Sequence, residues 1–376
     1  MNSLRKKRTW AEISLDNLQH NYYAIRSAVP ASCRFLGVVK ADAYGHGALQ
    51  VASLLERCGA DYLAVSCLDE AMELRNNGIR LPLLILGHTP SEYTAELIEN
   101  NITQAVTGLE KAEEYSAAAT ALGSSLRVHI KVDTGMSRLG FLCDERHAEE
   151  EIGHIARACR LPGLIPEGIF PHFAVSDEAG EDNRAYTMKQ FSLFMHVISS
   201  LEKNCGITFA LRHCANSGAV VSYPETALDM VRPGLLLYGY GDSSGRLGLR
   251  PCMRLVTTVS AIEEYEPGTS ISYGRHFVTD RYSRIGVLAA GYADGLPRAA
   301  SGKCAFYTAL GAVPQVGSIC MDMCMADLTD LNPVEVGMEV ELFGEHADLC
   351  ALADAAGTIP YEILCSVTKR VPRIYR

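Results

Sequence analysis

Residues 38–47 read VVKADAYGHG, and the fold is best deduced from this stretch. An apolar run that begins at Phe35 ends in a single lysine, Lys40, and a turn with two glycines then leads into a segment of helical composition. Because an ammonium group needs water or a partner, a lysine at the end of a buried strand is expected to point into a cleft. Lysine also forms Schiff bases with carbonyl compounds, so Lys40 is a candidate for covalent binding. A solvated lysine at a strand end is the plainer alternative.

Eight short apolar runs of this kind alternate with segments rich in Ala, Leu, Glu, Lys and Arg. They cover residues 35–40, 62–67, 82–87, 103–107, 127–133, 166–172, 209–214 and 230–237. Runs that are apolar on both faces and alternate with helices are typical of a parallel sheet. Eight such units before residue 240 predict a (β/α)8 barrel of the TIM type. An open, doubly wound sheet shows the same alternation and stays open as the alternative.

The alternation stops in a Gly/Ser-rich stretch at residues 238–250. Beyond it, the segments 253–263, 285–290, 304–317, 319–327 and 336–343 are rich in β-forming residues, and a helical pattern occurs only near 348–356. We therefore predict a barrel over residues 1–247 and a mostly-β C-terminal domain over residues 248–376, with residues 1–10 allowed to pack with the second domain.

The composition excludes several classes of protein. The net charge of −10 over 376 residues argues against a general nucleic-acid binder. No apolar run has the length of a membrane span, and no secretory signal follows the basic residues at the start. The 13 cysteines include no CxxC pair, which indicates reduced thiols in the cytoplasm and favours neither disulfides nor a metal site.

Polar residues gather where the predicted strands end, and barrels carry their chemistry at those ends. They are Lys40 and Tyr44 after the first strand, Lys131, Asp133 and Arg138 at the fifth, His172 at the sixth, His213, Asn216 and Ser217 at the seventh, and Arg232, Gly234 and Leu235 in the eighth. Taken singly, most have a structural explanation, such as a helix cap or a hydrogen-bonded core histidine. Taken together, they indicate a phosphate-binding site at strands seven and eight and a lysine across the barrel mouth from it. This combination predicts that the protein binds pyridoxal 5′-phosphate, PLP.

With these motifs, the sequence resembles the alanine racemases, which are fold-type III PLP enzymes, over nearly its whole length. The matching motifs occur in the family's order: VVKADAYGHG, KVDTGMSRLG, PHFAVSDE, RHCANSGA, VRPGLLLYG, SYGRHF, AGYADG, SICMDM and PYEILC. The resemblance implies a PLP-binding barrel, a β domain and a head-to-tail homodimer that shares its active sites. It also implies interconversion of L- and D-alanine, which by class would supply D-alanine for cell-wall peptidoglycan.

The resemblance assigns two bases. Lys40 would bind PLP and act on one face of the substrate carbon, and Tyr273, contributed by the partner subunit, would act on the opposite face. Racemisation removes a proton from one face and returns one to the other, so one base on each face is the simplest solution. Arg232, oriented by His213, would face the pyridine nitrogen, and Arg138 would lie near the cofactor phenolate and the substrate carboxylate.

Further roles follow from the same resemblance. Tyr44, Ser217, Gly234, Leu235 and Tyr361 match the phosphate ligands, with Asn216 beside them. Met321 of the partner, with Asp322 beside it, matches the contact to the substrate carboxylate. Lys131 matches a lysine that is often carbamylated. The residues that match the family's entry corridor to the active site are His172, Asp177, Tyr292 and Arg298. One departure is Ser318, which stands where many relatives carry arginine and is expected to alter the electrostatics of the interface or corridor.

Three alternatives stay open at this point. A PLP-dependent decarboxylase shares the two-domain plan, but it needs no opposite-face base. A noncatalytic PLP carrier would be a barrel alone. A broad-specificity or serine-preferring racemase is the nearest alternative, and Tyr361 argues against it because relatives that prefer serine tend to carry a smaller residue there.

Overall fold

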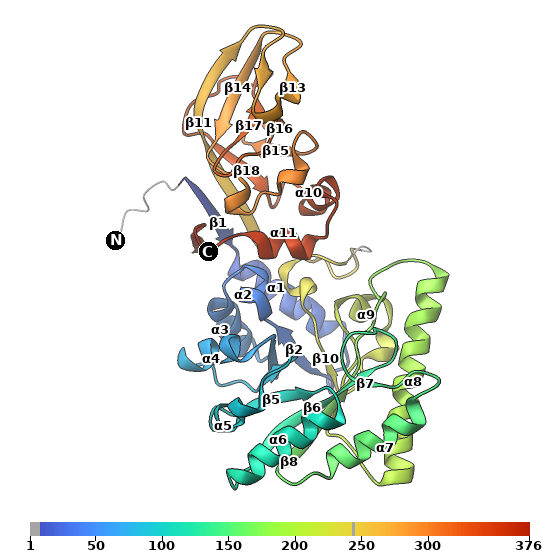
Figure 1. Cartoon of the computed structure of the whole chain (residues 1–376). Helices are drawn as coiled ribbons and strands as arrows, with labels where there is room; N and C mark the ends of the chain where they lie inside the picture. The colour runs from blue at the N-terminus through green and yellow to red at the C-terminus, as the bar shows by residue number, and fades with distance from the viewer. Residues whose placement is uncertain (1–7, 243–244) are drawn as a thin grey trace. The chain divides into compact units, whose positions relative to one another are not determined.

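The computed structural model describes residues 8–242 and 245–376 (Figure 1). The chain forms two compact units. The barrel unit comprises Gln19–Ala43 and Ala48–Leu249, and the C-terminal unit comprises Arg250–Arg376 with Tyr44–Gly47 and the described part of Met1–Leu18. Part of the stretch expected to pack with the second domain, residues 1–7, lies outside the described residues, as do residues 243 and 244 of the Gly/Ser-rich stretch.

Eight parallel strands form the barrel. Their order is β10 (Met230–Val231), β2 (Arg34–Val38), β3 (Tyr62–Val65), β4 (Leu83–Ile85), β5 (Ile102–Val106), β6 (Leu126–Asp133), β8 (Leu164–Phe170) and β9 (Leu211–Arg212). A single bridge between Asn216 and Arg232 closes the ring between β9 and β10. The prediction of a (β/α)8 barrel is confirmed, and the open doubly wound sheet is wrong, because this bridge joins the two ends of the strand order.

Helices cover the outside of this ring, with α6 and α7 packed against β8 and α8 packed against α7 (Figure 1). The helices of the barrel region are α1 (Leu15–Ser27), α3 (Ala48–Cys58), α4 (Leu68–Asn76), α5 (Thr94–Glu99), α6 (Leu109–Ala121), α7 (Ala148–Cys159), α8 (Glu181–Cys205) and α9 (Ser217–Ser222), with short 3-10 turns η1 (Ser91–Tyr93), η2 (Pro224–Thr226) and η3 (Leu235–Tyr238). A two-residue strand, β7 (Phe141–Leu142), pairs with β6. Strands β3, β4 and β5 are buried at every position, which explains the apolar sequences of β3 and β4.

The C-terminal unit is built on a mostly antiparallel sheet, as predicted. Its strand order is β14 (Ser283–Leu288), β17 (Cys324–Asp327), β16 (Gly311–Val316), β15 (Ala305–Thr308), β18 (Glu339–Phe343), β11 (Met253–Tyr265), β1 (Thr9–Ile13) and β19 (Arg373–Tyr375). Because β11 also pairs with β14, the first six of these strands close into a ring of their own. A hairpin of β12 (Ser270–Ile271) and β13 (Phe277–Val278) carries η4 (Tyr273–Arg275) between its strands.

Two parts of the C-terminal unit go beyond the sequence-based prediction, which allowed residues 1–10 to pack with this domain but named no strand there. Strand β1 pairs with β11 along Thr9–Ile13, a long-range pairing with no local signal. A second helix, α11 (Pro360–Ser366), follows α10 (Leu349–Ala356), although only the latter was expected. Proline at the first position of α11 is a usual helix start, and the helix is too short to show a clear periodicity. The 3-10 turns η5 (Tyr292–Asp294) and η6 (Arg298–Ala300) complete the unit.

Candidate active site

Lys40 follows β2 and begins an unusual turn. Residues 41–44 all have a positive φ of 52–54°, so they form a left-handed turn without any glycine. Each such residue costs about 1–2 kcal/mol. A turn of this kind persists only where the surrounding structure holds it, and such strain is concentrated at functional sites.

Two carboxylates hold this turn within the barrel unit. Glu70 accepts the N–H of Ala41 at 2.7 Å with one oxygen and the N–H of Ser66 at 2.7 Å with the other. Asp42 accepts the N–H of Ala48, the first residue of α3, at 2.8 Å. The backbone beside the half-buried Lys40 is therefore fixed. Sequence reasoning did not identify Glu70, which looks like an ordinary acidic residue in the first turn of α4.

The loop that carries Arg138 is organised by Asp133 at the end of β6. The Asp133 carboxylate accepts four backbone N–H groups, those of Gly135, Met136 and Ser137 at 2.9–3.0 Å and that of Arg138 at 2.8 Å. Although partial burial acts to raise it, the pKa of Asp133 is lowered because these donors stabilise the carboxylate. Asp133 therefore shapes the loop and leaves Arg138 exposed at its end.

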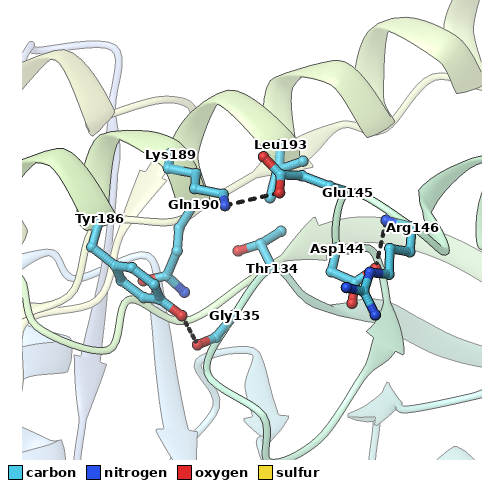
Figure 2. A pocket seen from close by; sticks show the side chains of 9 residues that line it. All are labelled: Thr134, Gly135, Asp144, Glu145, Arg146, Tyr186, Lys189, Gln190 and Leu193. Atoms are coloured by element: carbon cyan, nitrogen blue, oxygen red, sulfur yellow. Dashed lines mark hydrogen bonds and ion pairs between the residues drawn. The ribbon is translucent and has the colours of Figure 1, made fainter.

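The other face of this loop lines a pocket of about 210 Å³ against α8, shown in Figure 2. The Tyr186 hydroxyl donates to the carbonyl of Gly135 at 2.7 Å, which anchors the loop to the helix. Lys189 of α8 pairs with Glu145 at 3.0 Å across the pocket. The Arg138 loop is thus held by Asp133 from within and by Tyr186 from outside.

Several cations converge at the carboxyl ends of β6, β8 and β9. Burial lowers the pKa of His172 well below its usual value, and four positive charges add to the effect: Arg232, Lys131, Arg138 and Lys40. Burial likewise lowers the pKa of Lys131 well below its usual value, with a further contribution from Arg232, while Asp133 opposes the shift. A concentration of positive charge of this kind favours an anionic ligand.

Arg232 is fully fixed inside the barrel. One terminal nitrogen donates to the carbonyl of His213 at 2.6 Å and lies 3.1 Å from its Nδ1. The other donates to the carbonyls of Pro171 at 3.0 Å and Cys214 at 3.1 Å. Complete burial lowers the pKa of Arg232 to about 10, so the guanidinium stays charged at neutral pH.

A chain of polar groups continues from Arg232 through the barrel interior. Burial lowers the pKa of His213 well below its usual value and also lowers the pKa of His129, so both rings are neutral at neutral pH. Because Arg232 can only donate, His213 accepts at Nδ1 and donates from Nε2 to Nδ1 of His129 across 2.9 Å. His129 then carries its proton on Nε2, 3.6 Å from the carboxylate of Glu167, which accepts the hydroxyl of Tyr62 at 2.7 Å.

Sequence reasoning identified Arg232 and His213 but missed the other side chains of this polar network, His129, Glu167 and Tyr62. A signal was present, because His129, Lys131 and Asp133 alternate along β6 and therefore share one face of the strand. Glu167 stands inside an otherwise apolar strand, where a carboxylate needs a partner. Gly168 makes room for the network, since a Cβ there would lie 2.7 Å from the His129 ring.

The predicted phosphate residues of the barrel unit are brought together. Asn216 caps α9 by accepting the N–H of Ala219 at 3.0 Å and also accepts the Ser176 hydroxyl at 2.8 Å. Gly234 donates its N–H to the Ser217 hydroxyl at 2.9 Å, which joins the start of α9 to the start of η3 at Leu235. Helix starts present backbone N–H groups without intrahelical acceptors, so this junction is suited to an anion.

The remaining candidates belong to the C-terminal unit. The rings of Tyr44 and Tyr361 lie 5.8 Å apart, and burial raises the pKa of Tyr44. Tyr292 donates its N–H to the carbonyl of Cys320 at 2.9 Å, next to Met321. Arg370 pairs with Asp322 at 2.8 Å.

In contrast to these paired residues, the Tyr273 side chain is 73% exposed, and Met321 is 54% exposed. Among residues 8–242 and 245–376, no three His, Cys, Asp or Glu side chains are placed to hold a metal ion. No helix in the described ranges is long and apolar enough to cross a membrane.

Two family models match the chain, the alanine racemase N-terminal domain over residues 13–242 and the alanine racemase C-terminal domain over residues 252–375. The chain belongs to the alanine racemase family. It is 44% identical to alanine racemase 1 of Clostridium acetobutylicum, with 97% of this chain and 95% of that protein covered. It is 43% identical to an alanine racemase of Clostridium perfringens, covering 98% of this chain and 95% of that protein.

Solved alanine racemase structures have the same fold. The alanine racemase of Clostridium difficile 630 superposes with a TM-score of 0.90 at 40% identity, covering 98% of this chain and 96% of that one. The enzyme from D-cycloserine-producing Streptomyces lavendulae has a TM-score of 0.91 at 35% identity, covering 98% and 97%. The Bacillus anthracis enzyme with bound L-Ala-P has a TM-score of 0.89 at 32% identity, covering 100% and 96%.

Proposed function

We propose that this protein is a PLP-dependent alanine racemase that works with two bases, Lys40 and the partner subunit's Tyr273. The observation that carries the proposal is the buried Arg232, whose two terminal nitrogens are hydrogen-bonded within the barrel unit, in the same unit as the strand-end Lys40. A guanidinium in this position is a permanent donor that does not release its proton. Together with the family membership, this arrangement favours a racemase over a decarboxylase or a PLP carrier.

The residues of the barrel unit fit PLP by their chemistry. Lys40 offers an amine for an aldehyde, and the joined starts of α9 and η3 at Ser217 and Gly234 offer backbone N–H groups for a phosphate. Gly218 is required at this junction because a Cβ would lie 2.6 Å from the backbone nitrogen of Asp177. The positive charges around His172 suit an anionic cofactor and an anionic substrate.

Each residue then has a defined task. Lys40 would hold the cofactor covalently, Arg232 would donate to its ring nitrogen, and Ser217, Gly234 and Leu235 would bind its phosphate, joined in the family pattern by Tyr44 and Tyr361. When bound, PLP withdraws electrons from the substrate Cα and so makes its proton acidic. Arg138 orients the substrate carboxylate, with Met321 and Asp322 of the partner subunit on its far side.

Proton transfer on the two faces of Cα requires two groups in different places. Lys40 takes or returns the proton on one face, and the partner subunit's Tyr273 does so on the other. The exposure of Tyr273, Met321 and Met323 in a single chain supports a homodimer, because large apolar side chains gathered on one surface commonly mark an interface.

Lys131 is proposed to carry a carbamate. Burial lowers the pKa of its amine well below the usual value, which favours the neutral form that can add to carbon dioxide and release a proton to water. The resulting anion would offset the charges of Arg232 and Arg138. Growth or incubation with ¹³C-labelled bicarbonate should give a carbamate carbon signal in NMR that is absent from Lys131→Ala.

We propose alanine as the substrate, because relatives that prefer serine tend to carry a smaller residue than Tyr361 at this position. The product D-alanine would serve peptidoglycan synthesis in the cytoplasm. A broad-specificity or serine-preferring racemase is the alternative.

An assay of D/L interconversion across an amino-acid panel, with Lys40→Ala as the control, separates the candidate functions. We expect alanine to be racemised fastest. Faster turnover of serine than of alanine would indicate a serine-preferring racemase. Release of carbon dioxide would indicate a decarboxylase, and PLP binding without turnover would indicate a PLP carrier.

A further inference from the structure

The turn that carries Tyr273 has a strained backbone. Ser272 has φ 69° and ψ −177°, a combination that is almost restricted to glycine. Gly274 and Arg275 follow with φ of 76° and 54°. Three of the four residues from 272 to 275 therefore have a positive φ, and only the surrounding contacts can keep this backbone in place.

Ser318 and Ser272 provide those contacts through two reciprocal hydrogen bonds. The Ser272 hydroxyl donates to the carbonyl of Ser318 at 2.8 Å, and the Ser318 hydroxyl donates to the carbonyl of Tyr273 at 2.8 Å. The two backbones approach as closely as glycine allows, because a Cβ on Gly317 would lie 2.8 Å from the carbonyl oxygen of Ile271. We call this pair of hydrogen bonds the serine clasp.

The serine clasp is anchored on a rigid segment. Gln315 donates to the carbonyl of Gly317 at 2.9 Å, and the N–H of Ile319 donates to the Ser301 hydroxyl at 3.0 Å. Ser318 itself is only 5% exposed. The Tyr273 side chain, in contrast, projects into solvent in the single chain, so packing within the chain does not set its position. Its position depends on the backbone that the clasp holds.

We propose that Ser318 is a positioning residue for Tyr273. The inference rests on the proposed function, in which the partner subunit receives Tyr273 as a base. Ser318 acts through its hydrogen bond to the Tyr273 carbonyl. This role differs from the sequence-based expectation, in which serine in place of arginine alters the electrostatics of the interface or corridor. A base displaced by a fraction of an ångström loses much of its rate advantage, so the clasp should matter more for turnover than for stability.

Ser318→Ala in the holoenzyme tests the proposal. We expect kcat for alanine racemisation to fall by about tenfold to a hundredfold, with unchanged PLP occupancy and little change in KM. The two bases serve different faces, so the primary deuterium isotope effect should rise with one enantiomer of α-deuterated alanine and fall with the other. A merely structural role would not produce this opposite change. Ser318→Thr, which keeps the hydroxyl, should recover much of the loss.

Two further variants separate positioning from folding. Ser272→Gly removes one hydrogen bond of the clasp and relieves the backbone strain, so we expect an equal or higher Tm together with a lower kcat. Ser283→Ala is the matched control, because Ser283 is also a buried serine of this unit that donates to a backbone carbonyl, that of Arg281 at 2.9 Å. It should leave kcat and both isotope effects unchanged.

The outcomes distinguish this proposal from the proposed function. The positioning role would be overturned if Ser318→Ala and Ser272→Gly both kept the native kcat and isotope effects while Tyr273→Phe was inactive. That result would leave the two-base function intact. Full activity in Tyr273→Phe would overturn the proposed function itself.

Discussion

Replacing Arg232 by lysine should destabilise the barrel unit while leaving its charge unchanged. Within 3.1 Å, the guanidinium makes four contacts from two nitrogens, to three carbonyls and to the His213 ring. A lysine has one nitrogen, which can occupy only one of the two positions, so two of the four contacts are lost. At about 1.5–3 kcal/mol for each hydrogen bond from a charged group, the expected loss is about 3–6 kcal/mol of unfolding free energy.

Urea unfolding followed by far-ultraviolet circular dichroism measures this loss, because the barrel unit holds most of the helices. Trp10 is the single tryptophan and lies in β1 of the C-terminal unit, so its fluorescence gives a separate signal for that unit. Measurements with and without PLP distinguish lost packing from lost cofactor binding, since a bound ligand adds its own stabilisation.

Arg157→Lys is the matched control. Arg157 lies in the same unit and pairs with Glu113, but its side chain is 64% exposed. We expect a change within about 0.5 kcal/mol for this variant. If Arg232→Lys without PLP also changed the unfolding free energy by less than about 1 kcal/mol, the four contacts would not fix the guanidinium as described.

Three further predictions concern Gly168 and Tyr62 of the barrel unit and Tyr361 of the C-terminal unit. Gly168→Ala should cost about 1–3 kcal/mol by denaturation, because its Cβ would meet the His129 ring; an unchanged midpoint would contradict the packing. Tyr62→Phe should cost about 1.5–3 kcal/mol at neutral pH. The pKa of Glu167 is lowered by its interaction with His129, 3.6 Å away, and by the hydrogen bond from the Tyr62 hydroxyl. This stabilisation is therefore present above the unfolded pKa of about 4.3 and is lost as pH falls through the folded value. Denaturation in a pH series should show the cost shrinking in acid, and a cost independent of pH would contradict this. Tyr361→Asn should raise the serine/alanine ratio of kcat/KM, and an unchanged ratio would remove the argument for alanine specificity.

The barrel and most of its strand-end residues could be predicted from local sequence. Buried parallel strands are apolar throughout, so the run before Lys40 and the runs around Lys131 and Arg232 stand out from the helices between them. Their polar ends are visible for the same reason. The second unit was predictable as β-rich, but β1 was not, because its partner β11 lies more than two hundred residues away in sequence.

Other parts of the site depend on contacts that no local pattern contains. The left-handed turn at residues 41–44 has no glycine, and its sequence favours a right-handed conformation. The hydrogen bonds that hold it, from Ala41 to Glu70 and from Ala48 to Asp42, are visible only in the structure. The extension of the His213 network to His129 needs the closed barrel to bring β6 and β9 together. The role of Ser318 depends on the strained turn at Ser272, which sequence alone does not show.

The most direct test uses two inactive variants, Lys40→Ala and Tyr273→Phe, which are mixed, dissociated and allowed to reassociate. It asks whether each active site joins Lys40 of one chain to Tyr273 of the other. Each variant alone should lack alanine racemisation, with covalent PLP lost only from Lys40→Ala. Random pairing makes half of the dimers hybrids, and each hybrid has one site with both native bases, so about a quarter of the native activity should return. No recovery in hybrids confirmed by mass would mean that Lys40 and Tyr273 do not meet across subunits.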